Sequence, residues 1–294
     1  MNSMLTQLLA KTPVITDGAW GTQLQSLGLS AEECPDAWNL KNPEKVVQVA
    51  HRYVAAGSQV VLTNTFRSNR ISLAGFGLDD LTVQINRAGV EISRRGAGKA
   101  ARVFASIGPT GKMLMSGEVT PEEVQSAFEE QARALAAAGA DALVVETMAD
   151  LEEAKLALAA ARGTGLPVVV SMVFDSGKEK DRTMMGLTVE QVAGALTEAG
   201  ASVVGANCGL GIEGYLPIGK RLRAATTLPI WIKANAGLPE LVNGKIEYRI
   251  TPREFADHAR TLRDEGVQFL GGCCGTTPEF IRALREALSP PAQV

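Results

Sequence analysis

The stretch GGCCGTTP at residues 271–278 places two adjacent cysteines, Cys273 and Cys274, between glycines. It follows a short apolar run and precedes a helical pattern that begins at Thr277 or Pro278. Neighbouring residues of a strand point to opposite faces, so adjacent thiols can reach one ligand only where the backbone bends. Flanking glycines permit such a bend, because they adopt left-handed backbone angles at little cost. The pair becomes informative only with a third cysteine and a scaffold that brings it near.

The size and composition of the chain limit its class. The 294 residues suit one α/β barrel, which needs about 250 residues. The net charge of −3 is spread over both signs and no apolar run approaches a membrane span, so we expect neither nucleic acid nor membrane as a partner. No signal-type core precedes the first apolar run, which predicts a cytoplasmic protein. Four cysteines in such a protein are more typical of metal ligands or buried thiols than of disulfides.

Short apolar runs alternate with helical patterns along the whole chain. The runs are nearly continuous in apolar residues, as in strands buried on both faces of a parallel sheet. They recur about every 37 residues, the size of one βα unit. The expected strands cover residues 14–16, 60–63, 103–107, 142–145, 168–173, 203–205, 230–233 and 269–270. This pattern predicts an α/β fold with a single (β/α)8 TIM barrel over residues 1–294, and a doubly wound sheet is the alternative.

The boundaries of the helices carry their own signals. Asn42, Thr120, Thr251 and Thr277 each precede a proline, which combines an N-cap residue with proline at the first helical position. Longer connections at residues 108–120 and 174–187 follow strands, so we expect substrate loops there. The tail at residues 289–294 is expected to fray.

Polar residues follow the expected strands, at the end of the barrel where active sites of this fold are built. They include carboxylates, amides and three of the four cysteines, at Asp17, Asn64, Glu146, Asn207, Cys208, Asn235, Cys273 and Cys274. Cys208 follows the sixth strand and the vicinal pair follows the eighth. These strands lie two apart in a closed ring, so we expect the three thiols to converge.

Three thiolates without histidine suit Zn²⁺, which binds sulfur tetrahedrally. Three protein ligands leave one position open, as in catalytic zinc sites. Cys34 as a fourth ligand and three inert buried thiols without a metal remain as alternatives. A zinc ion with three thiolates carries net negative charge, so it favours binding and deprotonating a substrate thiol over activating water. The sequence therefore predicts zinc-dependent alkylation of a thiol.

Two carboxylates share the expected rim with the cysteines. With a thiolate as nucleophile no separate base is required, so Asp17 and Glu146 are interpreted as anchors for an ammonium group. Helix capping or loop bracing is the alternative for each. Gly18 permits close approach of the backbone to a ligand carboxylate, which N–H groups at helix N-termini would bind.

Motifs in chain order resemble the homocysteine S-methyltransferase family. They are DGAWGT at 17–22, TNTF at 63–66, GP at 108–109, ET at 146–147, NC at 207–208, NAGLP at 235–239 and GGCCGTTP at 271–278. The family includes the homocysteine-binding module of cobalamin-dependent methionine synthase and the betaine– and S-methylmethionine–homocysteine methyltransferases.

The resemblance implies an S-methyltransferase that makes methionine in a zinc-bearing barrel, with Cys208, Cys273 and Cys274 as catalytic zinc ligands. It implies that homocysteine sulfur takes the open position, with Asp17 and Glu146 near its amino group. Further substrate contacts are expected from Gly18, Asn64, Thr65 and Asn207. Asn235 matches an asparagine that can be the fourth ligand without substrate.

The resemblance leaves the methyl donor open among S-methylmethionine, a betaine or sulfonium compound, and a corrinoid- or folate-linked methyl. The partner that supplies it is either a small donor molecule or a separate corrinoid protein. Trp38 falls where the betaine and S-methylmethionine enzymes place a tryptophan, with packing of its loop as the alternative. Trp20 is expected to narrow the donor channel. Arg67 stands where the betaine enzyme has a cage tyrosine. Alternatives to the whole assignment are a different thiol acceptor and, in another class, a zinc- or redox-sensing barrel built on Cys273 and Cys274.

Overall fold

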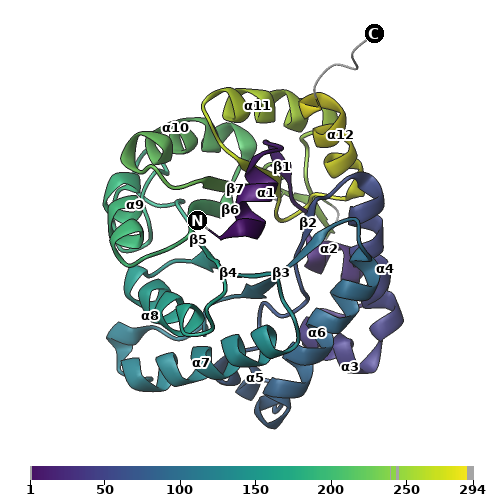
Figure 1. The fold of residues 1–294 in the computed structure, drawn as a ribbon, viewed down its shortest axis with the longest axis vertical. Coiled ribbons are helices and arrows are strands. Elements are labelled where there is room, and N and C mark those ends of the chain that lie inside the picture. The colour runs from purple at the N-terminus through teal and green to yellow at the C-terminus, as the bar shows by residue number, and fades with distance from the viewer. Residues whose placement is uncertain (1, 239, 243–244, 290–294) are drawn as a thin grey trace.

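The computed structural model describes residues 2–238, 240–242 and 245–289, so Pro239 of the NAGLP motif and the predicted frayed end at 290–294 lie outside the described residues. Eight parallel strands form the barrel in the order β1-β10-β7-β6-β5-β4-β3-β2. Figure 1 shows them ringed by helices. The barrel strands are β1 (Val14–Ile15), β2 (Val60–Val61), β3 (Arg102–Ile107), β4 (Ala142–Met148), β5 (Val168–Met172), β6 (Val203–Gly211), β7 (Ile230–Asn235) and β10 (Phe269–Gly272).

The predicted TIM barrel is confirmed, and each expected strand overlaps an observed one. The alternative of a doubly wound sheet is wrong, because the first strand pairs in parallel with the last, Val14 opposite Phe269. Between the short strands β1 and β2, the Gln59 N–H donates to the Ile15 carbonyl at 2.7 Å and continues the ring. A small antiparallel ladder, β8 (Glu240–Val242) with β9 (Lys245–Glu247), stands apart from the barrel sheet.

The helices surround the strands and close one end of the barrel. They are α1 (Ser3–Leu9), α2 (Trp20–Ser26), α3 (Trp38–Lys41), α4 (Pro43–Ala56), α5 (Arg70–Ala74), α6 (Thr82–Ala97), α7 (Pro121–Ala137), α8 (Leu151–Arg162), α9 (Val189–Glu198), α10 (Tyr215–Ala225), α11 (Pro252–Asp264) and α12 (Pro278–Leu288). Within the described ranges, no helix combines the length and hydropathy needed to cross a membrane.

The four predicted helix starts are correct in position, but only two of the four predicted N-cap side chains make a capping hydrogen bond. Thr120 and Thr251 form complete capping boxes with the glutamates three residues on. The side chains of Asn42 and Thr277 make no capping hydrogen bond, although each stands at an N-cap. Asn42 departs from the extended backbone of a typical N-cap, with φ −138° and ψ 52°, so the proline that follows is the stronger signal there.

An apolar layer fills the lower half of the barrel. Trp231 stacks on Phe104 with ring centroids 6.3 Å apart and also contacts Phe269. Leu5 of α1 joins this layer beside Val14 and closes the amino-terminal end, a plug that the sequence did not predict. Figure 1 shows α1 lying across the barrel. Any site must therefore lie above this layer, toward the carboxyl ends of the strands.

Candidate metal centre and substrate site

Three cysteine sulfur atoms meet at the carboxyl ends of β6 and β10. The Sγ atoms of Cys208, Cys273 and Cys274 all lie within 4.8 Å of one another, and those of Cys208 and Cys274 are 3.9 Å apart. Zinc–sulfur bonds of about 2.3 Å at tetrahedral angles place two sulfurs roughly 3.8 Å apart. The predicted convergence is confirmed, and the spacing fits a zinc ion.

The backbone is shaped to present these sulfurs. Cys208 has a left-handed φ of 62°, rare for a residue with a side chain, and the register of β6 against β7 shifts between Asn207 and Gly211. The Tyr215 hydroxyl donates to the Cys208 carbonyl at 2.5 Å and holds this distortion. A Cβ on Gly272 would lie 2.2 Å from the Thr276 hydroxyl, so the turn after β10 requires glycine.

Two asparagines hold the cysteine loops. The Asn235 Oδ1 accepts the Cys274 N–H at 3.1 Å, which places this predicted fourth ligand beside the sulfurs. The Asn207 Nδ2 faces the Cys273 sulfur at 3.9 Å, and its Oδ1 accepts from the Thr147 N–H at 2.9 Å. Asn207 is therefore positioned as a brace between β4, β6 and the turn after β10.

The three thiols shift the pKa values of one another. Hydrogen bonds with Cys273 and Cys274 lower the pKa of the Cys208 thiol. Hydrogen bonding with Cys208, together with burial, raises the pKa of the Cys273 thiol. A metal ion that bound all three sulfurs as thiolates would displace their protons.

A layer of buried charge lies in the upper barrel. Asp17, just after β1, forms an ion pair with Lys233 of β7 through its Oδ1, and both side chains are at most 4% exposed. Its Oδ2 accepts the Leu62 N–H at 2.7 Å and the Trp20 indole N–H at 2.6 Å. The predicted Asp17 therefore lies in this layer with a lysine already bound to it.

Glu146, on β4, belongs to the same layer. Its Oε1 accepts the Ser106 hydroxyl at 2.5 Å. Burial raises the pKa of the Glu146 carboxyl, and the nearby Lys233 ammonium opposes that shift. Burial disfavours the charged form of Lys233, but Asp17 and Glu146 outweigh it and raise the pKa of the ammonium. Lys233 was not among the predicted site residues, because it stands at the end of an apolar run in the sequence.

Other predicted site residues are placed as braces. Trp38 is buried in α3, where its indole N–H donates to Glu33 at 3.2 Å and Lys45 lies 4.8 Å above its ring. The Asn64 Nδ2 donates to the Pro35 carbonyl at 2.8 Å, and the Thr65 hydroxyl donates to the Ser106 carbonyl at 2.7 Å.

Gly18 and Cys34 also have packing roles. A Cβ on Gly18 would lie 2.8 Å from both the Thr276 hydroxyl and the Tyr53 ring, so this glycine permits close contact within the protein. Cys34 is buried in a separate cluster with Leu73 and Ile85 and is not among the three converging cysteines. The alternative in which Cys34 is the fourth zinc ligand is therefore wrong.

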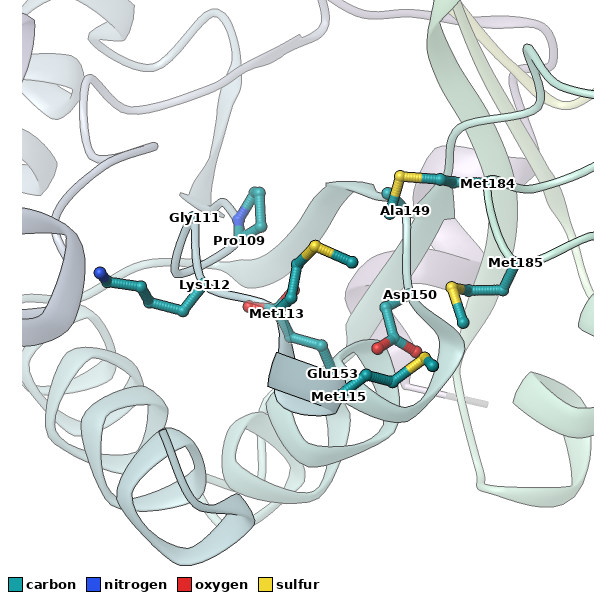
Figure 2. Close-up of a pocket in the computed structure, with 10 residues that line it drawn as sticks. All are labelled: Pro109, Gly111, Lys112, Met113, Met115, Ala149, Asp150, Glu153, Met184 and Met185. Atoms are coloured by element: carbon teal, nitrogen blue, oxygen red, sulfur yellow. The ribbon is translucent and has the colours of Figure 1, made fainter. Parts of the chain in front are cut away.

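A pocket of about 190 Å³ opens on the same face, between the loops after β3, β4 and β5. Figure 2 shows four methionine side chains around it, with the Asp150 carboxylate among them. Met113, Met115, Met184 and Met185 are all exposed, and they come from the two connections that were expected to carry substrate loops. Ala149, three positions after Glu146 in the sequence, is one of the residues that line the pocket.

Comparison with known proteins identifies the family. The sequence model of the homocysteine S-methyltransferase family matches residues 14–288. The chain belongs to the homocysteine S-methyltransferase family. The expectation of a methyltransferase enzyme is thereby confirmed at the level of the family.

Similar proteins include the methionine synthases of Mycobacterium leprae and Mycobacterium tuberculosis, 30% and 29% identical to this chain. Each alignment covers 97% of this chain but 25% of the relative, so the chain spans a quarter of their length. The metallated form of the homocysteine methyltransferase MmuM from Escherichia coli shares the fold, with a TM-score of 0.80, 24% identity and coverage of 97% of this chain and 99% of that one. A methyltransferase from Methanosarcina mazei follows with a TM-score of 0.60, 15% identity and coverage of 97% and 96%.

Proposed function

We propose that residues 1–294 form one homocysteine-binding barrel domain that transfers a methyl group to the thiol of homocysteine and gives methionine. The zinc ion would be held by Cys208, Cys273 and Cys274. The observation that carries this proposal is the meeting of three sulfurs within 4.8 Å at the carboxyl end of a barrel from this family. We infer a cytoplasmic enzyme.

The residues of the chain divide the work of the reaction. When bound, zinc would acidify the substrate thiol, so that it is a thiolate at neutral pH. The Tyr215 hydroxyl and the distorted end of β6 fix Cys208, while Asn235 fixes the turn that carries Cys274. Asn235, whose Oδ1 accepts the Cys274 N–H, would be the fourth ligand before substrate arrives. In the transfer, the bond between the homocysteine sulfur and the methyl carbon forms as the bond between the donor and the methyl carbon breaks. The electron pair of the broken bond stays with the donor.

The donor is inferred to enter from the methionine-lined pocket. Four thioethers and the Asp150 carboxylate suit a small donor with a methylated cationic group, such as a sulfonium or quaternary ammonium compound. The exposure of the same methionines favours a separate corrinoid protein as the second candidate, because exposed apolar patches mark interaction surfaces.

The test is metal analysis followed by an assay of methionine formation. Zinc-replete protein is mixed with homocysteine and, in parallel, with S-methylmethionine, glycine betaine, a dimethylsulfonium compound or methylcobalamin. Cys208→Ser should lose zinc and turnover together, whereas the control Cys34→Ser should keep both. Absence of methionine with every donor would refute the proposal. An oxidant response that survives Cys208→Ser would instead favour the redox sensor.

A further inference from the structure

The buried layer beneath the cysteines contains one cation between two carboxylates. We propose that Lys233 neutralises Asp17 and thereby leaves Glu146 as the single anchor for the amino group of the substrate. This inference rests on the proposed function, in which an amino acid thiol is the methyl acceptor. It makes Lys233 a specificity-determining residue.

Asp17 is closed to a second ammonium group. Its side chain is 0% exposed, and the Lys233 ammonium occupies Oδ1. Two N–H donors, from Leu62 and the Trp20 indole, occupy Oδ2. A substrate ammonium would have to displace Lys233, which is itself buried and forms an ion pair with no other carboxylate of the described residues.

Only one of the two carboxylate oxygens of Glu146 accepts a hydrogen bond from the described residues. The Ser106 hydroxyl donates to Oε1 at 2.5 Å, and none of the described residues donates to Oε2. That oxygen is nevertheless not one of the fully enclosed polar atoms that lack a partner, so it retains contact with accessible space. Glu146 does not line the methionine pocket itself, but Ala149, three positions further along the chain and just after the end of β4, does.

The charges of the layer lead to the same assignment. A bound ammonium group would favour the ionised form of both carboxylates, and one lysine would then leave one negative charge, which that ammonium group would cancel. Because the Lys233–Asp17 contact pairs two of the three charges, the uncompensated one falls on Glu146. Without Lys233, Asp17 would be free to bind an ammonium group in its place.

If Lys233 blocks Asp17, its removal should restore the binding of an amino group that the loss of Glu146 abolishes. A purely structural role of Lys233 would not produce such a gain. Dissociation constants of homocysteine and of 4-mercaptobutanoate, which lacks the amino group, are measured by calorimetry on zinc-loaded protein. Their ratio is the amino-group preference. Wild type should prefer homocysteine by about tenfold or more, the worth of a hydrogen bond between charged groups. Glu146→Gln keeps an acceptor for Ser106 and should bring the ratio close to one.

The double variant Glu146→Gln/Lys233→Met should regain the preference, because it restores one unpaired carboxylate at Asp17. The matched control is Asp36→Asn, which removes another buried carboxyl, hydrogen-bonded to the Ser68 hydroxyl and the Arg67 N–H, and should leave the ratio unchanged. Circular dichroism and zinc content check that each variant is folded. If the double variant does not fold, Glu146→Gln alone still decides whether Glu146 is the anchor.

A preference that survives Glu146→Gln would overturn the inference. So would a double variant whose ratio stays as low as that of Glu146→Gln, because Lys233 would then not be blocking Asp17. Loss of affinity for both thiols in the double variant but not in Glu146→Gln would also overturn it, since Lys233 would then bind the carboxylate that both thiols carry. Failure of wild type to bind homocysteine at all would overturn the proposed function itself.

Discussion

Replacing Lys233 by methionine should destabilise the protein strongly. The substitution keeps a long side chain but leaves the Asp17 charge, which is 0% exposed, without its ion-pair partner. Removing one member of a buried pair costs about 3–5 kcal/mol. For a chain of 294 residues, an unfolding entropy of about 2.1 cal/mol/K per residue gives roughly 0.6 kcal/mol/K. The expected fall in Tm is therefore about 5–8 °C.

The assay is thermal and urea unfolding of zinc-loaded protein, compared with the double variant Asp17→Asn/Lys233→Met. The pair variant has no buried charge at either position, and the amide oxygen that it introduces in place of the carboxylate could still accept from the Leu62 N–H. It should therefore lie within about 1–2 kcal/mol of wild type. If Lys233→Met alone costs no more than the pair variant, the ion pair does not stabilise the fold as argued.

Three further outcomes are expected. Tyr215→Phe removes the hydrogen bond to the Cys208 carbonyl, which should cost about 1 kcal/mol of stability and weaken zinc binding about tenfold. Competition with a chelator measures the zinc affinity. Gly272→Ala should lose zinc because of the clash described above, while Gly21→Ala, whose Cβ would meet nothing within 4 Å, should keep it. Burial raises the pKa of the Glu146 carboxyl, so the folded protein loses stability relative to the unfolded chain as the pH rises past about 4.5. The free energy of unfolding of wild type, relative to that of Glu146→Gln, should therefore fall from pH 4 to pH 7. Urea titrations at each pH measure this difference.

The barrel was readable from the sequence because its strands are buried on both faces. Runs such as 168–173 are apolar without alternation, and helix boundaries such as Thr120 carry local signals. The meeting of Cys208 with Cys273 and Cys274 followed from the topology alone, since parallel strands place their carboxyl ends together.

What the sequence did not predict depends on side-chain direction and local backbone distortion. The partner of Asp17 is a lysine 216 positions away, and only the register of β7 turns it inward. The left-handed Cys208 has no sequence signal apart from the glycine that follows it. Asn64 belongs to the TNTF motif and Trp38 stands where relatives have a tryptophan, yet neither position gives an orientation, and both side chains contact neighbouring loops.

Three alternate residues of strand β7 contribute side chains to three different layers of the barrel interior. Trp231 packs in the apolar plug, Lys233 pairs with Asp17, and Asn235 holds the cysteine turn. Side chains two apart along a strand share a face at steps of about 6.6 Å, so one short segment sets the height of all three layers. A single-residue deletion at Ile232 would break this shared alignment, because every side chain beyond it would turn to the other face. Insertions and deletions should therefore be tolerated far less in β7 than in the methionine-bearing loops, and insertion scanning would measure that difference.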